Sequence, residues 1–143
     1  MKGIYILLLR VKKHLRIRVG SLGVVDFDEG EYVYVGSAQN SVEKRLRRHL
    51  RKRKPLRWHI DYLTANPYVQ ILNASIFPLS KPYECKAAKI ISSIGETYPI
   101  PRFGSTDCRC RSHLFRINTS FRRIISRLES EFKIRSLGAD LPR

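Results

Sequence analysis

The fold is decided by the stretch Gly3-Ile4-Tyr5-Ile6-Leu7-Leu8-Leu9-Arg10. This apolar run has the length of a strand and is rich in residues that favour β-structure, so it predicts a central strand. Residues 15–19 alternate strictly between apolar and basic side chains, and residues 24–27 continue as a strand. Another strand is predicted at Tyr32-Val33-Tyr34-Val35-Gly36. Turn residues at 20–23 and 28–31 separate these runs. The first 37 residues therefore predict an antiparallel meander of three or four strands.

Helical periodicity begins after the meander. Asn40 with Glu43 forms a capping-box pattern that predicts the start of a helix. Its buried face is predicted by an apolar residue at every fourth position: Val42, Leu46 and Leu50. The helix is expected to end at residues 54–55. Further elements are expected as helices at 56–64, 82–94 and 118–131, and as strands at 68–79 and 114–117. The predicted class is α+β: a small, mostly antiparallel mixed sheet flanked by three to four helices. We expect one domain over residues 1–131 and a loose tail over 132–143.

Composition limits the class of protein. The 143 residues contain 28 Lys plus Arg against 12 Asp plus Glu, a net charge of +16, and 43% of them are hydrophobic. The hydrophobic share argues against a disordered basic tail. No apolar run approaches the roughly 20 residues of a bilayer span, and the N-terminal run is too short for a signal peptide. These features predict a cytoplasmic protein with a polyanionic partner, nucleic acid rather than a membrane. Scarce Asn, Gln and Met beside abundant Arg and Ile hint at a thermophile.

The charge is concentrated in residues 44–57, which hold nine basic residues and no acid. Like charges four residues apart on a helix repel, so such a density favours neutralisation by phosphate over a bland solvated face. Arg45 and His49 share a helical face at the edge of the core, where a guanidinium can hold a phosphate and an imidazole can move a proton. The residues expected to grip a nucleic-acid backbone are Arg47, Arg48, Arg51, Lys52, Arg53 and Arg57.

Three cysteines leave several roles open. Cys108, Cys110 and His113 form a C-x-C-x-x-H cluster, and Cys85 could complete a zinc site, although this spacing is unusual for structural zinc. A disulfide that involves Cys85 is a second alternative. Buried or free thiols are the default expectation.

Two tripeptides and the helix after them point to a family. The motifs occur in the order Gly3-Ile4-Tyr5, Tyr34-Val35-Gly36, and Arg45 followed four residues later by His49. In this order they resemble the GIY-YIG nuclease family, and the resemblance covers residues 3–95. Members include homing endonucleases and the incision domain of bacterial excision repair. The resemblance implies that the two motif strands lie side by side. Segments 57–63 and 103–115 make the chain similar to an archaeal-type, largely uncharacterised branch of the superfamily.

The resemblance also implies a site. Its catalytic residues would be Tyr5, Tyr34, Arg45, His49 and Glu84, with Glu84 as the metal ligand and Glu96 as the fallback. The metal would be one Mg²⁺ or Mn²⁺, since no paired-carboxylate cluster is present for a two-metal site. Arg45 would stabilise charge on the phosphorus. A tyrosine would position and deprotonate water, which requires a lowered pKa.

The implied activity is metal-dependent hydrolysis of DNA phosphodiester bonds in repair or recombination, with no small-molecule cofactor and with a protein partner as one means of targeting. The chain departs from the family in two places. Tyr5 and Tyr34 are 29 residues apart, which leaves room for an extra hairpin at 15–27. The family's Asn after the third helix has no counterpart in residues 101–107, where Ser105 or Asp107 are the candidates to replace it.

Other readings of the same residues stay open. The leading alternative function is an inactive nucleic-acid-binding module on the same fold, and a third is an RNA-associated basic protein. Without the family pattern, Tyr5 and Tyr34 would be ordinary strand aromatics. Trp58 and Tyr62 are expected to pack their helix on the sheet.

Overall fold

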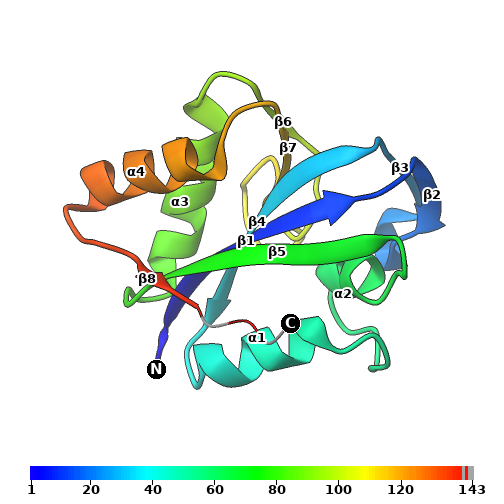
Figure 1. Cartoon of the computed structure of the whole chain (residues 1–143), viewed down its shortest axis with the longest axis horizontal. Helices are drawn as coiled ribbons and strands as arrows, with labels where there is room; N and C mark the ends of the chain where they lie inside the picture. The colour runs from blue at the N-terminus through cyan, green and yellow to red at the C-terminus, as the bar shows by residue number, and fades with distance from the viewer. Residues whose placement is uncertain (140, 142–143) are drawn as a thin grey trace.

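A six-stranded sheet forms the centre of the molecule (Figure 1). The computed structural model describes residues 1–139 and 141. In the sheet order β6-β7-β4-β1-β5-β8, the strands are Thr97–Pro99, Leu114–Ile117, Gly30–Ala38, Gly3–Val11, Val69–Phe77 and Leu137–Gly138. Every neighbouring pair is antiparallel. The predicted α+β class is confirmed, and so is the pairing of the two motif strands, because Tyr5 lies opposite Gly36.

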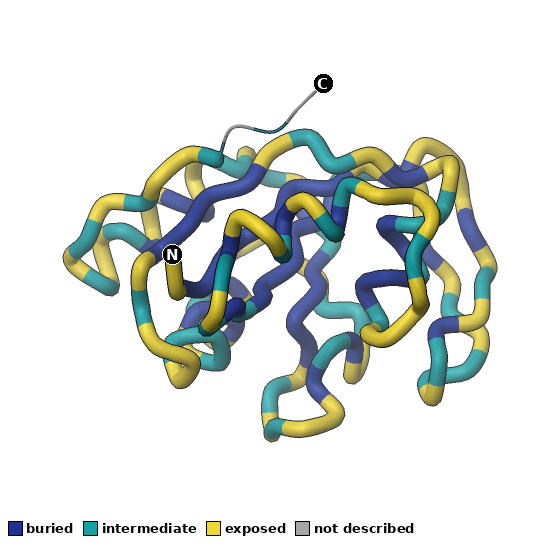
Figure 2. The backbone as a smooth tube through the Cα atoms, turned by 90° about the horizontal axis from the view of Figure 1, so that it is seen from below, coloured by how far each residue is buried: buried dark blue, intermediate teal, exposed yellow. Residues whose placement is uncertain are grey.

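Helices cover both faces of the sheet (Figure 1). On one face lie α1 (Val42–Leu50) and α2 (His59–Thr64), and on the other α3 (Pro82–Ser93) and α4 (Phe121–Phe132). Side chains of β1 alternate between two apolar cores: Tyr5, Leu7 and Leu9 pack towards α1 and α2, whereas Ile4, Ile6 and Leu8 pack towards α3 and α4. Burial on both faces explains why this strand is one continuous apolar run. Figure 2 shows the buried strands running through the middle of the molecule.

The glycines of the two tripeptides allow close approach of other groups. A Cβ atom on Gly3 would lie 2.5 Å from the carbonyl oxygen of Phe77 on β5. A Cβ atom on Gly36 would lie 2.3 Å from the ring of Tyr5. Any larger residue would push these neighbours away, so both glycines have a steric role in the sheet.

The predicted meander is wrong in its connections. β2 (Leu15–Arg18) and β3 (Val24–Phe27), joined through the 3-10 turn Gly20–Leu22, pair only with each other within the described residues, and β1 pairs directly with β4. The physical reason is burial: β1 is apolar on both faces and needs a long partner on each side, whereas the short hairpin buries only one face. Its Leu15 and Phe27 extend the core beneath α1 and α2.

Three helices start later than predicted: α2, expected from residue 56, begins at His59, and α1 and α4 are capped by serines further along the chain. Ser41, rather than Asn40, caps α1, and its hydroxyl accepts a hydrogen bond from the amide of Lys44 at 3.2 Å. Ser120, rather than Asn118 or Thr119, caps α4 in the same way, accepting from the amide of Arg123 at 3.1 Å. In each case the serine is the last extended residue, so its side chain can reach the first free amides.

The C-terminal segment is not the loose tail that the sequence predicts. α4 ends at the left-handed Lys133, the amide of Ser136 donates to Glu129, and β8 then pairs with the outer edge of β5. The amide of Ala139 also donates to the carbonyl of Ala74 at 3.1 Å. The segment is held because it satisfies backbone groups that the edge of β5 would otherwise leave unpaired. Residues 140, 142 and 143 of the predicted tail lie outside the described residues.

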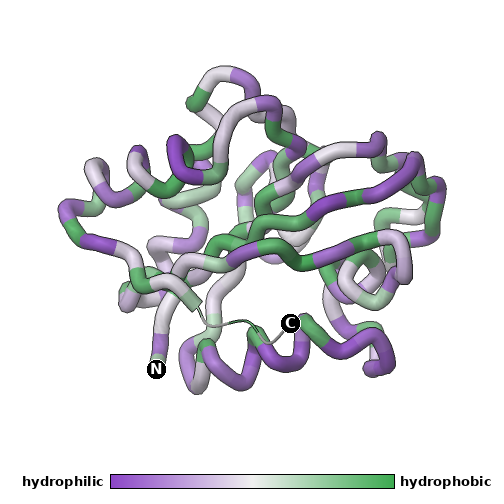
Figure 3. Tube along the Cα trace, in the orientation of Figure 1, coloured by the Kyte–Doolittle hydropathy of each residue, from purple (hydrophilic) through white to green (hydrophobic). Residues whose placement is uncertain are grey.

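The helices are short or polar on their outer faces. Among residues 1–139 and 141, none combines the length and the apolar character that crossing a bilayer requires. Figure 3 shows the contrast between the hydrophobic central strands and the hydrophilic α1 with the segment after it.

Candidate active site

One pocket of about 550 Å³ is lined by all five residues predicted to be catalytic. They come from four elements: Tyr5 from β1, Tyr34 from β4, Arg45 and His49 from α1, and Glu84 from the first turn of α3. The fallback residue Glu96 follows α3 and does not line this pocket. Residues from distant parts of the chain thus meet at one concave surface.

The pocket lies beside β4, at the point where the pairing of β4 with β7 ends. β7 pairs with β4 only as far as Tyr34, and beyond that point the loop before β7 takes over as the neighbour of β4. The amide of Val35 donates to the carbonyl of His113 in that loop at 2.9 Å. Gly104, Asp107, Cys108 and His113 of the same loop line the pocket together with Arg45.

Tyr5 and His49 form a buried polar pair at the base of the pocket. The hydroxyl of Tyr5 lies 2.7 Å from Nε2 of His49, and both side chains are buried. Burial, assisted by the positive charge of Lys54, lowers the pKa of His49 to about 3, so the ring is neutral at physiological pH. Within the described chain, Nδ1 of His49 has no hydrogen-bond partner.

The tyrosines do not have the lowered pKa that a water-activating base needs. Burial raises the pKa of Tyr5, and Arg45 opposes that rise without cancelling it. Burial likewise raises the pKa of Tyr34 well above its usual value, and Tyr5 and Glu84 add to the effect. The expectation of a lowered tyrosine pKa is therefore wrong for the protein without substrate, because the cost of desolvating a phenolate exceeds the stabilisation that one nearby guanidinium provides.

Arg45 is held at the pocket wall by two contacts. Its Nη1 donates to the carbonyl of Ser37 at 3.1 Å, and its guanidinium lies 4.4 Å from the ring centre of Trp58. The guanidinium of Arg48 lies 4.5 Å from the same ring. Trp58 is 39% exposed, so it does not pack α2 on the sheet as predicted but serves as a platform for two cations. Tyr62 does pack against the core, as expected.

Glu84 is the pocket carboxylate on α3. Burial raises its pKa, while Lys81 and Arg45 act in the opposite direction. Its Oε1 lies 3.8 Å from Nδ1 of His113. Of the two residues considered as replacements for the family Asn, Asp107 lines the pocket, whereas Ser105 is fully buried.

Two of the six predicted phosphate-binding residues form side-chain hydrogen bonds to other groups of the protein. Arg48 forms a two-pronged ion pair with the fully buried Asp61, at 2.6 and 2.9 Å, and also donates to the carbonyl of Pro55. Burial would raise the pKa of Asp61, but the hydrogen bonds from Arg48 and from two backbone amides outweigh it and the pKa is lowered. The Nζ of Lys52 donates to three backbone carbonyls, those of Thr64, Asn66 and Val69, at 2.6–3.0 Å. Both residues lie in the predicted basic segment, and because their side chains already bond to groups of the protein, their role in phosphate binding stays a prediction.

Asp61 has a structural role that the sequence does not predict. It accepts hydrogen bonds from the amides of Arg57 and Trp58 as well as from Arg48, so it anchors the turn into α2. The one signal in the sequence is that Asp61 is the first acid after the basic segment. His59 also has an unpredicted role, because its Nδ1 accepts the amide of Gly104 at 2.9 Å and ties α2 to the pocket loop.

The other four basic residues stay available to solvent. Arg47, Arg51, Arg53 and Arg57 are exposed, and none forms an ion pair in the described part of the chain. They lie on α1 and on the segment that joins it to α2, the same stretch of chain that carries Arg45 and leads to Trp58. The stretch that supplies Arg45 to the pocket therefore also carries exposed positive charge.

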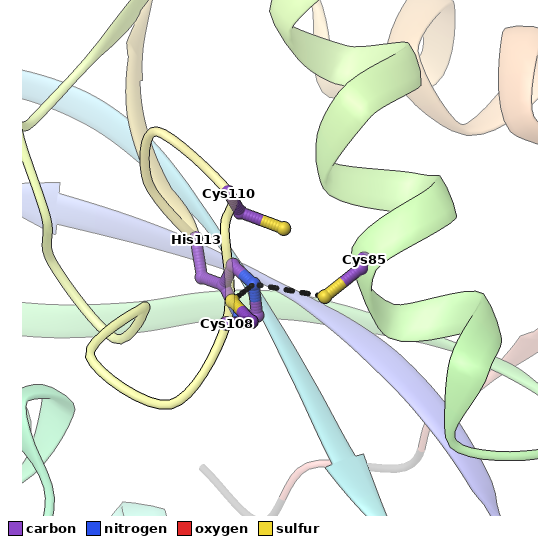
Figure 4. Close-up of side chains that lie close together, drawn as sticks. All are labelled: Cys85, Cys108, Cys110 and His113. Atoms are coloured by element: carbon purple, nitrogen blue, oxygen red, sulfur yellow. Dashed lines mark hydrogen bonds between the residues drawn. The ribbon is translucent and has the colours of Figure 1, made fainter.

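A group of soft ligands adjoins the same pocket. The ligand atoms of Cys85, Cys108, Cys110 and His113 all lie within 4.8 Å of one another, an arrangement that could hold a metal ion (Figure 4). The three cysteines are unpaired and half-buried, in line with the default expectation of free thiols.

Comparison with known proteins identifies the family of the chain. A family model described as a domain of unknown function, DUF123, matches residues 4–134. Neither the search of curated proteins nor the search of solved structures returned a match. Since the match spans nearly all of the sheet and the helices, the chain belongs to the DUF123 family.

Proposed function

We propose that this protein is a metal-dependent endonuclease that hydrolyses phosphodiester bonds of DNA, in the manner of the GIY-YIG nucleases that its sequence resembles. The observation that carries the proposal is the meeting of Tyr5, Tyr34, Arg45, His49 and Glu84 in one pocket. Such a pocket offers a cation for a phosphate, a carboxylate for a metal and a buried proton path. DNA repair or recombination is the expected setting.

Arg45 is suited to stabilise the transition state. Its side chain is already restrained by Ser37 and Trp58, so little conformational entropy is lost when a phosphate binds. A guanidinium can contact two phosphate oxygens at once, and its attraction grows as charge develops on the phosphorane. Arg45 can stabilise the transition state without gaining or losing a proton.

Tyr5 and His49 together can remove a proton from water where Tyr5 alone cannot. In the tautomer of neutral His49 that carries its ring proton on Nδ1, the hydroxyl of Tyr5 donates to Nε2. As the attacking water gives a proton to the oxygen of Tyr5, the hydroxyl proton of Tyr5 passes to Nε2. The imidazolium formed is unfavourable in the free protein, and a bound phosphate anion near Arg45 would raise the pKa of His49 and reduce that cost.

Glu84 is the residue that would hold a divalent cation, Mg²⁺ or Mn²⁺. Its carboxylate lines a pocket with space for water, and a single carboxylate suits a hard cation that keeps most of its waters. When bound, the cation would polarise an oxygen of the scissile phosphate. Burial raises the pKa of Glu84, and Lys81 and Arg45 oppose that rise, as a bound cation would, in favour of the ionised carboxylate that such binding needs.

Exposed arginines support the choice of a nucleic-acid substrate. Arg47, Arg51, Arg53 and Arg57 would contact phosphates on either side of the scissile bond, without reading the base sequence. Recognition of DNA shape, or delivery by a protein partner, would then supply selectivity.

A binding module without catalysis is the second candidate. The observation that favours it is the absence of the family Asn from residues 101–107, together with the raised pKa of both tyrosines. Such a module would bind DNA through the same arginines and cut nothing.

A cleavage assay separates the two candidates. Plain, flapped and branched DNA would be incubated with the protein in Mg²⁺, in Mn²⁺ and in a chelator. We expect metal-dependent cutting that falls at least about 10²-fold in Arg45→Ala and in Glu84→Gln. The matched control is Arg127→Ala, which removes an exposed arginine of α4 that pairs with Glu131 far from the pocket wall. Binding without cutting on every substrate would overturn the nuclease proposal and leave the binding module.

A further inference from the structure

Four soft ligands from two distant segments meet beside the pocket. Cys85 lies in the first turn of α3, whereas Cys108, Cys110 and His113 lie on the loop that precedes β7. Figure 4 shows the side chains pointing towards a common centre between the helix and the loop. An arrangement of this kind needs both segments to be in place, so it belongs to the folded state.

The separations fit a tetrahedral zinc ion. Sγ of Cys108 lies 3.5 Å and Sγ of Cys85 lies 3.9 Å from Nε2 of His113. With zinc bonds of about 2.3 Å to sulfur and about 2.0 Å to nitrogen, tetrahedral geometry separates S from N by about 3.5 Å and S from S by about 3.8 Å. All four atoms lie within 4.8 Å of one another, so small side-chain rotations complete the geometry.

The donor set selects the metal. Three thiolates and one imidazole match the ligands of structural zinc sites and are poor ligands for Mg²⁺ or Mn²⁺, which prefer oxygen. With four protein ligands there is no open position for water or substrate, so such a site is structural rather than catalytic. It is therefore distinct from the oxygen-donor site proposed at Glu84.

His113 is already oriented as a zinc ligand. It is 2% exposed, its amide donates to the carbonyl of Phe103 at 2.8 Å, and its carbonyl accepts from Val35. While Nε2 faces the cysteines, Nδ1 faces the Glu84 carboxylate at 3.8 Å. Zinc-binding histidines commonly direct their second nitrogen to a carboxylate in this way.

We propose that Cys85, Cys108, Cys110 and His113 bind one zinc ion that fastens the loop before β7 to α3. Because Cys85 follows Glu84 directly and His113 faces it, the same ion would hold the Glu84 carboxylate at the pocket. The consequence for Glu84 rests on the proposed nuclease function, whereas the zinc site itself does not.

Metal analysis of the purified full-length protein tests the site. We expect one zinc per chain after dialysis, and near-complete loss of zinc in Cys108→Ser and in Cys110→Ser. The matched control is His14→Gln, which removes an exposed histidine of the region before β2 and should leave the zinc content unchanged. Metal-free protein that takes up neither zinc nor cobalt under reducing conditions would overturn the proposal.

A second measurement does not depend on whether the variants fold. Cobalt loaded into the wild-type chain should give the visible bands of a tetrahedral ion and a thiolate charge-transfer band. The three thiols should also react slowly with a thiol reagent until a chelator is added. Rapid reaction of all three thiols in the native protein, or a disulfide between two of them, would contradict a zinc site.

Glu84→Gln separates the two metal proposals. It should keep one zinc per chain because Glu84 is not among the four ligands, while it loses DNA cleavage. If the wild-type protein held zinc but cut no DNA, the zinc site would stand and the nuclease function would fall. If the protein cut DNA but held no zinc, the nuclease function would stand and the zinc site would fall.

Discussion

The hydroxyl of Tyr5 on β1 lies 2.7 Å from Nε2 of His49 on α1, across 44 residues of sequence. This contact joins the first motif strand to the basic helix at the base of the pocket. It also places a phenol and a neutral imidazole in a buried pair whose chemistry depends on both members.

Removal of the Tyr5 hydroxyl tests the proton path. Tyr5→Phe keeps the ring that packs over Gly36 but ends the proton transfer to His49, so cleavage should fall about 10²-fold or more while DNA affinity is unchanged. Single-turnover cleavage and a binding titration would measure both. Tyr32→Phe is the matched control, because the Tyr32 hydroxyl donates to the carbonyl of Asp28 outside the pocket. Cleavage by Tyr5→Phe at the wild-type rate would exclude the path.

The buried His49 predicts a loss of stability in acid. Its pKa is about 3 in the folded protein, below the value of 6.5 for an unperturbed histidine. Between these pH values the unfolded state binds more protons than the folded state. The stability that depends on neutral His49 is therefore fully present above about pH 6.5. As the pH falls further, the free energy of unfolding decreases by up to about 1.4 kcal/mol per pH unit. Urea unfolding from about pH 7 to about pH 4.5 should show a shallower pH dependence in His49→Gln.

Tyr5→Phe serves as the control for that experiment. It alters the partner of His49 but keeps the buried imidazole, so its unfolding free energy should retain the wild-type dependence on pH. Equal slopes for wild type and His49→Gln would show that His49 does not titrate as its burial predicts.

The close approach of Tyr5 to Gly36 predicts a steric effect. In Gly36→Ala the new methyl group would lie 2.3 Å from the Tyr5 ring, which is buried and has little room to move. The free energy of unfolding should fall by about 1–3 kcal/mol, as for other overpacked cores. Gly95→Ala is the control, because nothing lies within 4 Å of the position that its methyl group would take, and the change should be within about 0.5 kcal/mol. Similar denaturation midpoints for the two variants would contradict the steric account.

The basic segment predicts that adjacent cations have different roles. Replacing Arg51 and Arg53 by Ala should weaken DNA binding and reduce the slope of log affinity against log salt by about 0.9 for each phosphate that is no longer neutralised. Lys52→Ala should instead leave the salt slope unchanged and lower stability by about 1–3 kcal/mol, because three carbonyls lose their donor. Fluorescence anisotropy at several salt concentrations, with chemical denaturation, would measure both. A reduced salt slope in Lys52→Ala would show that its amine reaches DNA.

Local patterns predicted most of the elements. The apolar run of residues 3–10 became β1, and the four-residue repeat of Val42 and Leu46 became the buried side of α1. These predictions succeeded because side-chain periodicity is a local property of strands and helices. The direct pairing of β1 with β4 was expected only from the family resemblance and not from the local patterns, since strand pairing depends on which partner buries the most surface rather than on the nearest turn.

The α+β class, the two motif strands and the concentration of positive charge could all be predicted from the sequence. The partners of individual side chains became apparent only in the folded chain. Arg48 forms an ion pair with Asp61, and Lys52 donates hydrogen bonds to backbone carbonyls. Cys85 lies beside the loop cysteines, and Tyr5 contacts His49. These partners are far apart in sequence or are backbone groups without a sequence signal. Their pairing depends on long-range packing and on the loss of solvent, which no local pattern records.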